Sequence, residues 1–222
     1  AKMKIEHHPS EDSLMRYAAG TLEAGPAIIV AAHLEQCPAC RERMALCEAV
    51  GGGVLAETEP TPMSPNALAR ALAAIDDLPD DDAFERQRTE ASTPIVFGDL
   101  ELPGALRNAK IGRWRWMGPG MRFSRIRLPH DPQANVMLLK VAPGRALPEH
   151  GHSGTEFTQI IKGSYSDETG RYGPGDFAEM GADVEHEPIV DEGEDCICLA
   201  ALDGRMRFNG LIGRLVQPFY GV

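Results

Sequence analysis

The residues with the clearest chemistry lie in one short stretch, 33–40, which reads HLEQCPAC and has the spacing H-x3-C-x2-C. The histidine pair His7-His8 lies upstream of it. Two thiols and two imidazoles are a common ligand set for a four-coordinate structural zinc ion. His33 and Cys37 are four residues apart, so on a helix they share one face. The spacing predicts a His2Cys2 zinc site formed by His33, Cys37, Cys40 and one upstream histidine.

The fourth ligand of this site would be either His7 or His8. We favour His8, because it lies nearer to the helix start that we expect at Ser10. The competing interpretation of the whole stretch is a pair of buried apolar cysteines beside a hydrogen-bonded histidine.

Both thiol pairs of the chain have positions that bear on their reactivity. Pro38 favours the first turn of a helix, which places Cys37 and Cys40 at a helix N-terminus. The positive end of a helix lowers a thiol pKa, so we expect the thiolate form that zinc binds.

On a strand, Cys196 and Cys198 would face one side. These two cysteines either pack in the core or form a pair of oxidisable groups near a metal.

A second group of possible ligands lies in the later half of the chain. On a strand, His150 and His152 point to the same side. Glu156 follows after a turn, and His186 lies on a later strand that can face the first. Three imidazoles and one carboxylate directed into a barrel predict a site for a first-row divalent metal. The alternative is a set of surface histidines in a loop.

The spacing over residues 144–163 is G-x5-H-x-H-x3-E-x6-G, which matches the first motif of the cupin family. The second cupin motif is met in part: Pro174-Gly175-Asp176 and His186 are present. Gly181 and Asp183 stand where that motif has proline and glycine.

The pattern of the first 77 residues predicts four short helices, and these helices must position the His2Cys2 zinc site. The expected helices run from Ser10 to a stop at Gly20, over 26–36, over 38–50 and from Ser64-Pro65 to about residue 75. The glycine triplet 51–53 is expected to end the third of them. This part is too small for a large core of its own, so a metal or a partner would help it fold.

After Pro94 the pattern changes to short strand-like runs at 136–141, 157–161, 176–180, 196–199 and 206–208, separated by glycine and proline. The predicted fold is therefore two-domain, α then β: a small zinc-stabilised four-helix module followed by a cupin, a β jelly roll or barrel. We expect the zinc-binding helical domain at 1–77, a charged linker at 78–93 and the cupin-like metal-binding domain at 94–222.

The composition restricts the possible partners and the compartment. The net charge of −11 argues against direct binding to DNA and against an anionic membrane surface. Residues 1–80 contain six Lys/Arg and twelve Asp/Glu, a net charge of −6 that suits a basic protein partner. Five cysteines without regular spacing do not predict a disulfide framework, and no apolar run is long enough to span a membrane. We expect a cytoplasmic protein.

Taken together, the chain resembles the ChrR-type zinc-binding anti-sigma factors. The resemblance covers His7-His8, residues 17–22 and 33–40, the cupin ligands, and residues 195–201, 207–209 and 217–219. It implies that the helical module holds zinc and inhibits an extracytoplasmic-function (ECF) type sigma factor. It also implies that the cupin binds a second zinc and releases the sigma factor under singlet oxygen or related oxidants, without being a catalyst. The matched ligands are His8, His33, Cys37 and Cys40, then His150, His152, Glu156 and His186.

The alternative function is enzymatic. A His3Glu cupin can hold iron, manganese or nickel and support dioxygenase or isomerase chemistry, here fused to a zinc-binding interaction module. Metal content and turnover distinguish the two functions: two zinc ions without turnover favour the regulator, and one iron or manganese with oxygen uptake favours the enzyme.

Overall fold

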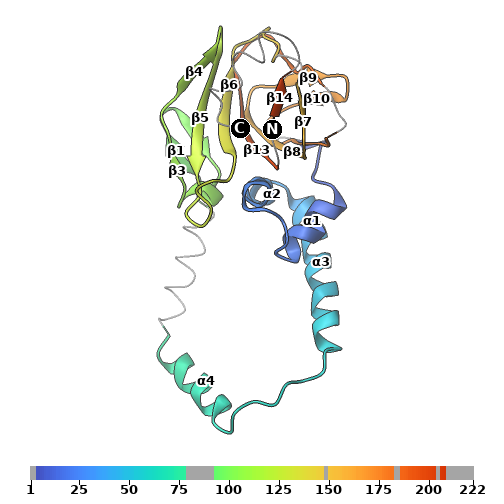
Figure 1. Cartoon of the computed structure of the whole chain (residues 1–222), viewed down its shortest axis with the longest axis vertical. Coiled ribbons are helices and arrows are strands. Elements are labelled where there is room, and N and C mark those ends of the chain that lie inside the picture. The colour runs from blue at the N-terminus through green and yellow to red at the C-terminus, as the bar shows by residue number, and fades with distance from the viewer. Residues whose placement is uncertain (1–3, 79–92, 148–149, 183–185, 204–205, 209–222) are drawn as a thin grey trace.

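The computed structural model describes residues 4–78, 93–147, 150–182, 186–203 and 206–208, with only the backbone described at 150–152 and 206–208. Helices come first and strands follow, as predicted (Figure 1). The expected linker at 78–93 lies almost entirely outside the described residues. The helices are α1 Glu11–Ala18, α2 Ala24–Gln36, α3 Pro38–Ala56 and α4 Ala67–Asp76, and a 3₁₀ helix, η1, covers Gly104–Leu106.

The first helix, α1, begins and ends for local reasons that the sequence predicts. The Ser10 hydroxyl accepts a hydrogen bond from the Ser13 amide, and Glu11 and Asp12 lie in the first turn, where the helix dipole favours acids. Gly20 follows with a φ of +67°, a left-handed conformation that suits glycine. The prediction of an N-cap at Ser10 and a stop at Gly20 is confirmed.

Helices α2 and α3 are separated by one extended residue, Cys37, with φ −103° and ψ 103°. Pro38 then opens α3, as predicted. The prediction that the glycines at 51–53 end this helix is wrong, because α3 continues to Ala56 and the Glu57 amide donates to the Gly53 carbonyl at 3.2 Å. Glycine weakens a helix but keeps the amide hydrogen that proline lacks, so helical hydrogen bonding continues.

The remaining two helix starts differ by a few residues from the expected ones. Helix α2 begins at Ala24, two residues before Pro26, and the proline lies in the first turn, where no amide donor is needed. Helix α4 begins at Ala67 rather than directly after Ser64-Pro65, and the Ala67 amide donates to the Ser64 carbonyl.

The β domain is built on an antiparallel sheet with the strand order β11-β8-β13-β6-β5-β3, and β4 also pairs with β5. Smaller sheets are β10-β9-β12, β14-β7 and β1-β2. All five predicted strand runs are found, with ends shifted by at most three residues. The strands are β1 Ile95–Phe97, β2 Leu100–Leu102, β3 Lys110–Ile111, β4 Arg115–Gly118, β5 Met121–Arg127, β6 Val136–Val141, β7 His150–His152, β8 Glu156–Lys162, β9 Tyr165–Asp167, β10 Gly170–Tyr172, β11 Phe177–Met180, β12 Ile189–Val190, β13 Cys196–Leu202 and β14 Met206–Phe208.

The two faces of the large sheet have different hydrophobic cores. One face carries Leu139, Ile160 and Cys198 into the interior of the β domain. The other face carries Phe157 and Phe177 against Leu14 of α1 and Ile29 of α2, so the helices and the sheet share one core. Helix α3 extends away from the sheet, and α4 lies farther along the chain with no buried residue (Figure 1).

No helix formed by the described residues is long and apolar enough to cross a bilayer.

The continuity of α3 through its glycines gives a testable prediction. A Cβ added at Gly52 meets no atom within 4 Å, so Gly52→Ala should stabilise this part of the helix by about 1 kcal/mol. Hydrogen exchange should show slower amide exchange on both sides of the substitution. Gly20→Ala is the matched control, because its site is equally open but left-handed, and it should destabilise the end of α1. Faster exchange in α3 of the Gly52→Ala variant would show that the helix is broken at 51–53.

Candidate metal centres

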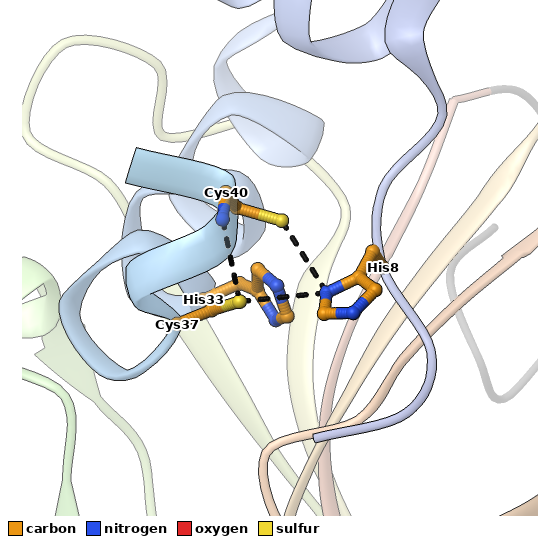
Figure 2. A group of neighbouring side chains, drawn as sticks. All are labelled: His8, His33, Cys37 and Cys40. Atoms are coloured by element: carbon orange, nitrogen blue, oxygen red, sulfur yellow. Dashed lines mark hydrogen bonds between the residues drawn. The ribbon is translucent and has the colours of Figure 1, made fainter. Parts of the chain in front are cut away.

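Four side chains from three segments meet below the sheet and form the N-terminal cluster, His8, His33, Cys37 and Cys40 (Figure 2). One ligand atom from each lies within 4.8 Å of the others. His8 Nδ1 is 3.4 Å from the Sγ atoms of both Cys37 and Cys40. The segment before α1 supplies His8, α2 supplies His33, and the α2–α3 junction with the first turn of α3 supplies the thiols. The structure therefore brings together the four residues that the sequence predicts.

The His33 imidazole is fully buried and held by a backbone carbonyl of the β domain. Its Nδ1 lies 3.1 Å from the Gly175 oxygen, and the ring packs edge-on against Phe177 at 5.4 Å. Nδ1 must donate to that carbonyl, which leaves Nε2 with its lone pair. Among the described residues, Nε2 has no hydrogen-bond partner. Burial, then the neighbouring His8, lowers the pKa of His33 to about 4, so the ring is neutral, as a metal ligand must be.

The neighbour His7 has a different role from His8. Its Nε2 lies 3.1 Å from the Arg171 carbonyl oxygen, and its ring packs on Tyr172 with the ring centres 4.2 Å apart. His8 is partly buried, and burial, followed by the charge of Arg43, lowers its pKa. The geometry thus favours His8 over His7 as the fourth member of the cluster.

The prediction that the helix N-terminus lowers the thiol pKa is wrong for Cys40. Burial, and then the hydrogen bond and charge of Cys37, raise the pKa of Cys40 to about 12. The dipole of α3 is too weak to offset desolvation of a thiolate in this place. A thiolate pair here needs a cation, and binding of a metal would displace the thiol protons.

The N-terminal cluster fits zinc. Ligands of a tetrahedral zinc ion with N and S donors lie about 3.3–3.8 Å apart, and the two measured N–S distances of 3.4 Å agree. The donor set of two imidazoles and two thiols, and the buried Nε2 of His33 facing it, are what a structural zinc ion requires.

The second group, which we call the cupin cluster, comprises Glu156 and His186 with the predicted ligands His150 and His152. Glu156 and His186 are both buried, and Glu156 Oε2 lies 4.0 Å from His186 Nε2. The Thr158 hydroxyl donates to Glu156 Oε1 at 3.0 Å. The structure places His150 and His152 on β7, paired with β14, but their side chains are not among those described. Their role as ligands therefore stays a prediction.

A carboxylate orients His186. His186 Nδ1 lies 3.1 Å from Asp167 Oδ2, which leaves Nε2 to face Glu156. Burial would raise the pKa of Asp167, but hydrogen bonds from Thr169 and His186 keep that pKa below its usual range. An ionised carboxylate that holds the far side of an imidazole is a common support for a histidine ligand.

The thiols of Cys196 and Cys198 are buried in the interior core and face the same side of β13. Burial, then Asp191 and Glu194, raise the pKa of Cys196 to about 12, and burial also raises that of Cys198. Both thiols are therefore protonated at neutral pH. The contacts agree with core packing, and no described residue bonds to either sulfur as a disulfide partner.

Sequence reasoning missed three residues that support the clusters: Gly175, Asp167 and Asp176. Gly175 and Asp176 belong to a recognised cupin turn, but their contacts with the helical module join positions more than 140 residues apart. Asp167 precedes His186 by 19 residues, and the hairpin between β9 and β10 that positions it had no motif to mark it.

The fold and the two clusters define a class of protein: a zinc-finger-type helical module joined to a cupin-like domain. A zinc-finger family model matches residues 10–41, and the family model "ChrR Cupin-like domain" matches residues 105–204. The anti-sigma-E factor ChrR of Cereibacter sphaeroides is 39% identical over 99% of this chain and 100% of that protein. The chain belongs to the ChrR family.

A solved structure agrees with this assignment. The crystal structure of Rhodobacter sphaeroides SigE in complex with the anti-sigma ChrR is similar at a TM-score of 0.71 and 37% identity, over 90% of this chain and 100% of that chain. A cupin protein from Ralstonia eutropha matches 55% of this chain and 74% of its own, at 19% identity and a TM-score of 0.40. The sequence identity and TM-score of this second structure are too low to support a conclusion.

The neighbouring histidines offer a matched test of the N-terminal cluster. His8→Ala should remove one ligand and lower the zinc bound at this cluster at least tenfold, measured by metal analysis after dialysis against a competing chelator. His7→Ala should retain its zinc, because the His7 ring contacts Arg171 and Tyr172 instead. Equal loss of zinc from both variants, or loss only from His7→Ala, would show that the assignment of His8 as the fourth ligand is wrong.

Proposed function

We propose that this protein is an anti-sigma factor that binds an ECF-type sigma factor through its helical module. The observation that carries the proposal is an uncovered apolar surface on α3 and α4. We call this the apolar helix surface; its residues are Leu46, Val50, Val54, Leu55, Leu68, Leu72 and Ile75. Each of these side chains is more than half exposed, from 55% at Leu72 to 73% at Leu55. These side chains lie on α4, which has no buried residue, and on the part of α3 beyond Met44. Large exposed apolar side chains of this kind indicate a protein interface.

The nature of the partner follows from the relatives and from charge. The 39% identical relative is named an anti-sigma factor, and the similar crystal structure is a complex of ChrR with SigE. The helical part of the present chain is acidic, with twelve Asp/Glu against six Lys/Arg in residues 1–80. Basic DNA-binding surfaces of a sigma factor complement that charge, and an apolar helix face supplies affinity that charge alone does not.

The apolar side chains of the four helices divide between the shared core and the solvent. Leu14 and Ile29 are buried against the sheet, and Ile28 is partly buried. Leu72 remains exposed. The partner would therefore contact the far ends of the helical module and not the face that α1 and α2 present to the β domain.

Zinc in the N-terminal cluster would hold the helical module in its binding shape. Of the buried residues in α3, Cys40 and Met44, one is a cluster residue, so few apolar contacts anchor this helix. Metal binding supplies the missing stability in small modules of this kind. We place the protein in the cytoplasm, because its proposed partner acts there with RNA polymerase.

The cupin cluster would hold a second zinc ion and receive the oxidant signal, including singlet oxygen. His186, Glu156 and the predicted His150 and His152 are suitable zinc donors. Histidine and cysteine side chains are oxidisable, and Cys196 and Cys198 lie in the interior core of the β domain. Oxidation of a ligand would weaken metal binding, and loss of a structural metal can shift a binding equilibrium by several kcal/mol.

The partner surface is tested by placing a charge on it. Leu72→Glu should weaken binding of the ECF-type sigma factor by roughly 10- to 100-fold, the cost of removing a central apolar contact. Ala73→Glu is the matched control, because it makes the same charge change on the side of α4 away from Leu68, Leu72 and Ile75. Calorimetry of the two purified proteins measures both affinities. Equal affinities for both variants would exclude α4 as the docking surface.

The signal input is tested in the cupin cluster. Glu156→Gln should weaken metal binding at the cupin cluster and so imitate the oxidised state, which lowers the affinity for the sigma factor by roughly tenfold before any illumination with a singlet-oxygen photosensitiser. Release is followed by size-exclusion chromatography of the complex. Glu101→Gln, on the exposed side of β2, is the control and should bind and release the sigma factor as wild type does. If Glu156→Gln binds the sigma factor before illumination, and releases it on illumination, as wild type does, the signal does not enter through this cluster.

The enzymatic alternative makes a different prediction about metal. A dioxygenase or isomerase would carry iron, manganese or nickel in the cupin cluster and show turnover. The regulator would carry zinc in both clusters and show none.

A further inference from the structure

The N-terminal cluster lies against the β domain and is held by it through hydrogen bonds. The Gly175 carbonyl accepts from His33 at 3.1 Å. Asp176 Oδ1 accepts from the amides of Glu6 and His7 at 2.7 and 3.0 Å, directly before His8. One turn of the cupin domain thus contacts the His33 side chain and holds the backbone that leads to His8.

The same turn continues into β11, which anchors the segment leading into α1. The Phe177 amide donates to the His7 carbonyl at 3.2 Å. Glu179 accepts from the Ser10 amide at 3.0 Å, the Ser10 hydroxyl at 2.9 Å and the Ser13 hydroxyl at 2.9 Å. We call residues 175–179 the docking segment.

The docking segment is also one strand away from the cupin cluster. β11 pairs with β8, and the register places Met180 opposite Glu156 and Phe177 opposite Gln159. A movement of β8 around Glu156 would therefore reach β11, the strand that holds the His7 and Ser10 backbone. The two clusters are connected through the adjacent strands β8 and β11 and through the hydrogen bonds that residues 175 and 176 make with the helical module.

The packing beneath α2 leaves one polar group unsatisfied. Gln159 is fully buried, and among the described residues neither its amide nitrogen nor its oxygen has a hydrogen-bond partner. A buried, unpaired amide costs about 1–3 kcal/mol. Water would relieve this cost when the helices move off the sheet, so the docked arrangement is stable but easily opened.

We propose that the docking segment controls how tightly the N-terminal cluster holds its zinc, and that a change at the cupin cluster reaches the helices through it. Gly175, Asp176 and Glu179 are positioning residues, because they hold the ligand-bearing segments without touching the metal. The proposal rests on the proposed metal occupancy of both clusters and adds the route between them.

The experiment follows metal release from the N-terminal cluster alone. Cobalt(II) bound to thiolates has a charge-transfer absorption that the predicted ligands of the cupin cluster cannot produce. The full-length protein is loaded with cobalt(II), excess EDTA is added, and the decay of this band is recorded. Asp176→Ala should release cobalt at least tenfold faster than wild type, the usual size of an effect on ligand support. Asp176→Asn should be intermediate, since its oxygen can still accept from Glu6 and His7.

Three further variants make the result specific. Glu179→Gln should also speed release, whereas Asp99→Ala, in an exposed turn, should not. Gln159→Met has nearly the same shape without the unsatisfied amide, and it should slow release. Circular dichroism checks that each variant is folded. Unchanged release from both Asp176→Ala and Glu179→Gln would overturn the proposal.

A double-mutant cycle tests the route. Glu156→Gln should speed cobalt release in the wild-type background and add little in the Asp176→Ala background. Strictly additive effects, or no effect of Glu156→Gln alone, would disprove coupling through the docking segment. These measurements need no sigma factor, so failure to bind one would overturn the anti-sigma function and leave this inference standing. Absence of the thiolate band from wild type would overturn the zinc site and this inference together.

Discussion

The hydrogen bond between the His33 imidazole and the Gly175 carbonyl determines how the two parts of the molecule fit together. It selects the ring nitrogen that remains available to the N-terminal cluster, and it fixes α2 over the sheet beside Phe177. The contact joins residues 142 positions apart, so it exists only when the cupin domain is folded. A metal cluster that would be complete in a free helical module is here supported from outside that module.

The shared core explains why this arrangement is stable. Helix α2 is apolar on most of its surface, with Ile29 and Val30 fully buried. A helix of this kind needs cover on more than one side, and α1 and α3 provide only part of it. The sheet provides the rest, and Glu35 adds a polar anchor by accepting from the Gly104 and Ala105 amides at 2.8 and 2.6 Å. Glu35, which lies between the cluster residues His33 and Cys37, thus also contributes to docking.

Sequence reasoning succeeded where spacing is local and failed where the answer depends on distant contacts. The H-x3-C-x2-C stretch spans only eight residues, so the end of α2, the extended Cys37 and the first turn of α3 bring its three ligands together. The thiol pKa of Cys40 was misjudged, because burial depends on segments that pack over it from elsewhere in the chain. The end of α3 was misjudged because three glycines lower helix propensity without preventing helical hydrogen bonds. Asp176 belongs to a cupin motif, but the motif did not predict its contacts, since its partners are backbone amides of residues 6 and 7.

The exposure of the apolar helix surface affects how long the protein persists in the cell. A chain that leaves Leu55, Leu68 and Ile75 in water is open to aggregation and to proteases that attack exposed helices. A partner bound there would cover that surface and act as a stabilising ligand by mass action. Release of the partner would then also expose this protein to degradation. Inhibition of the sigma factor would be restored only by newly made protein.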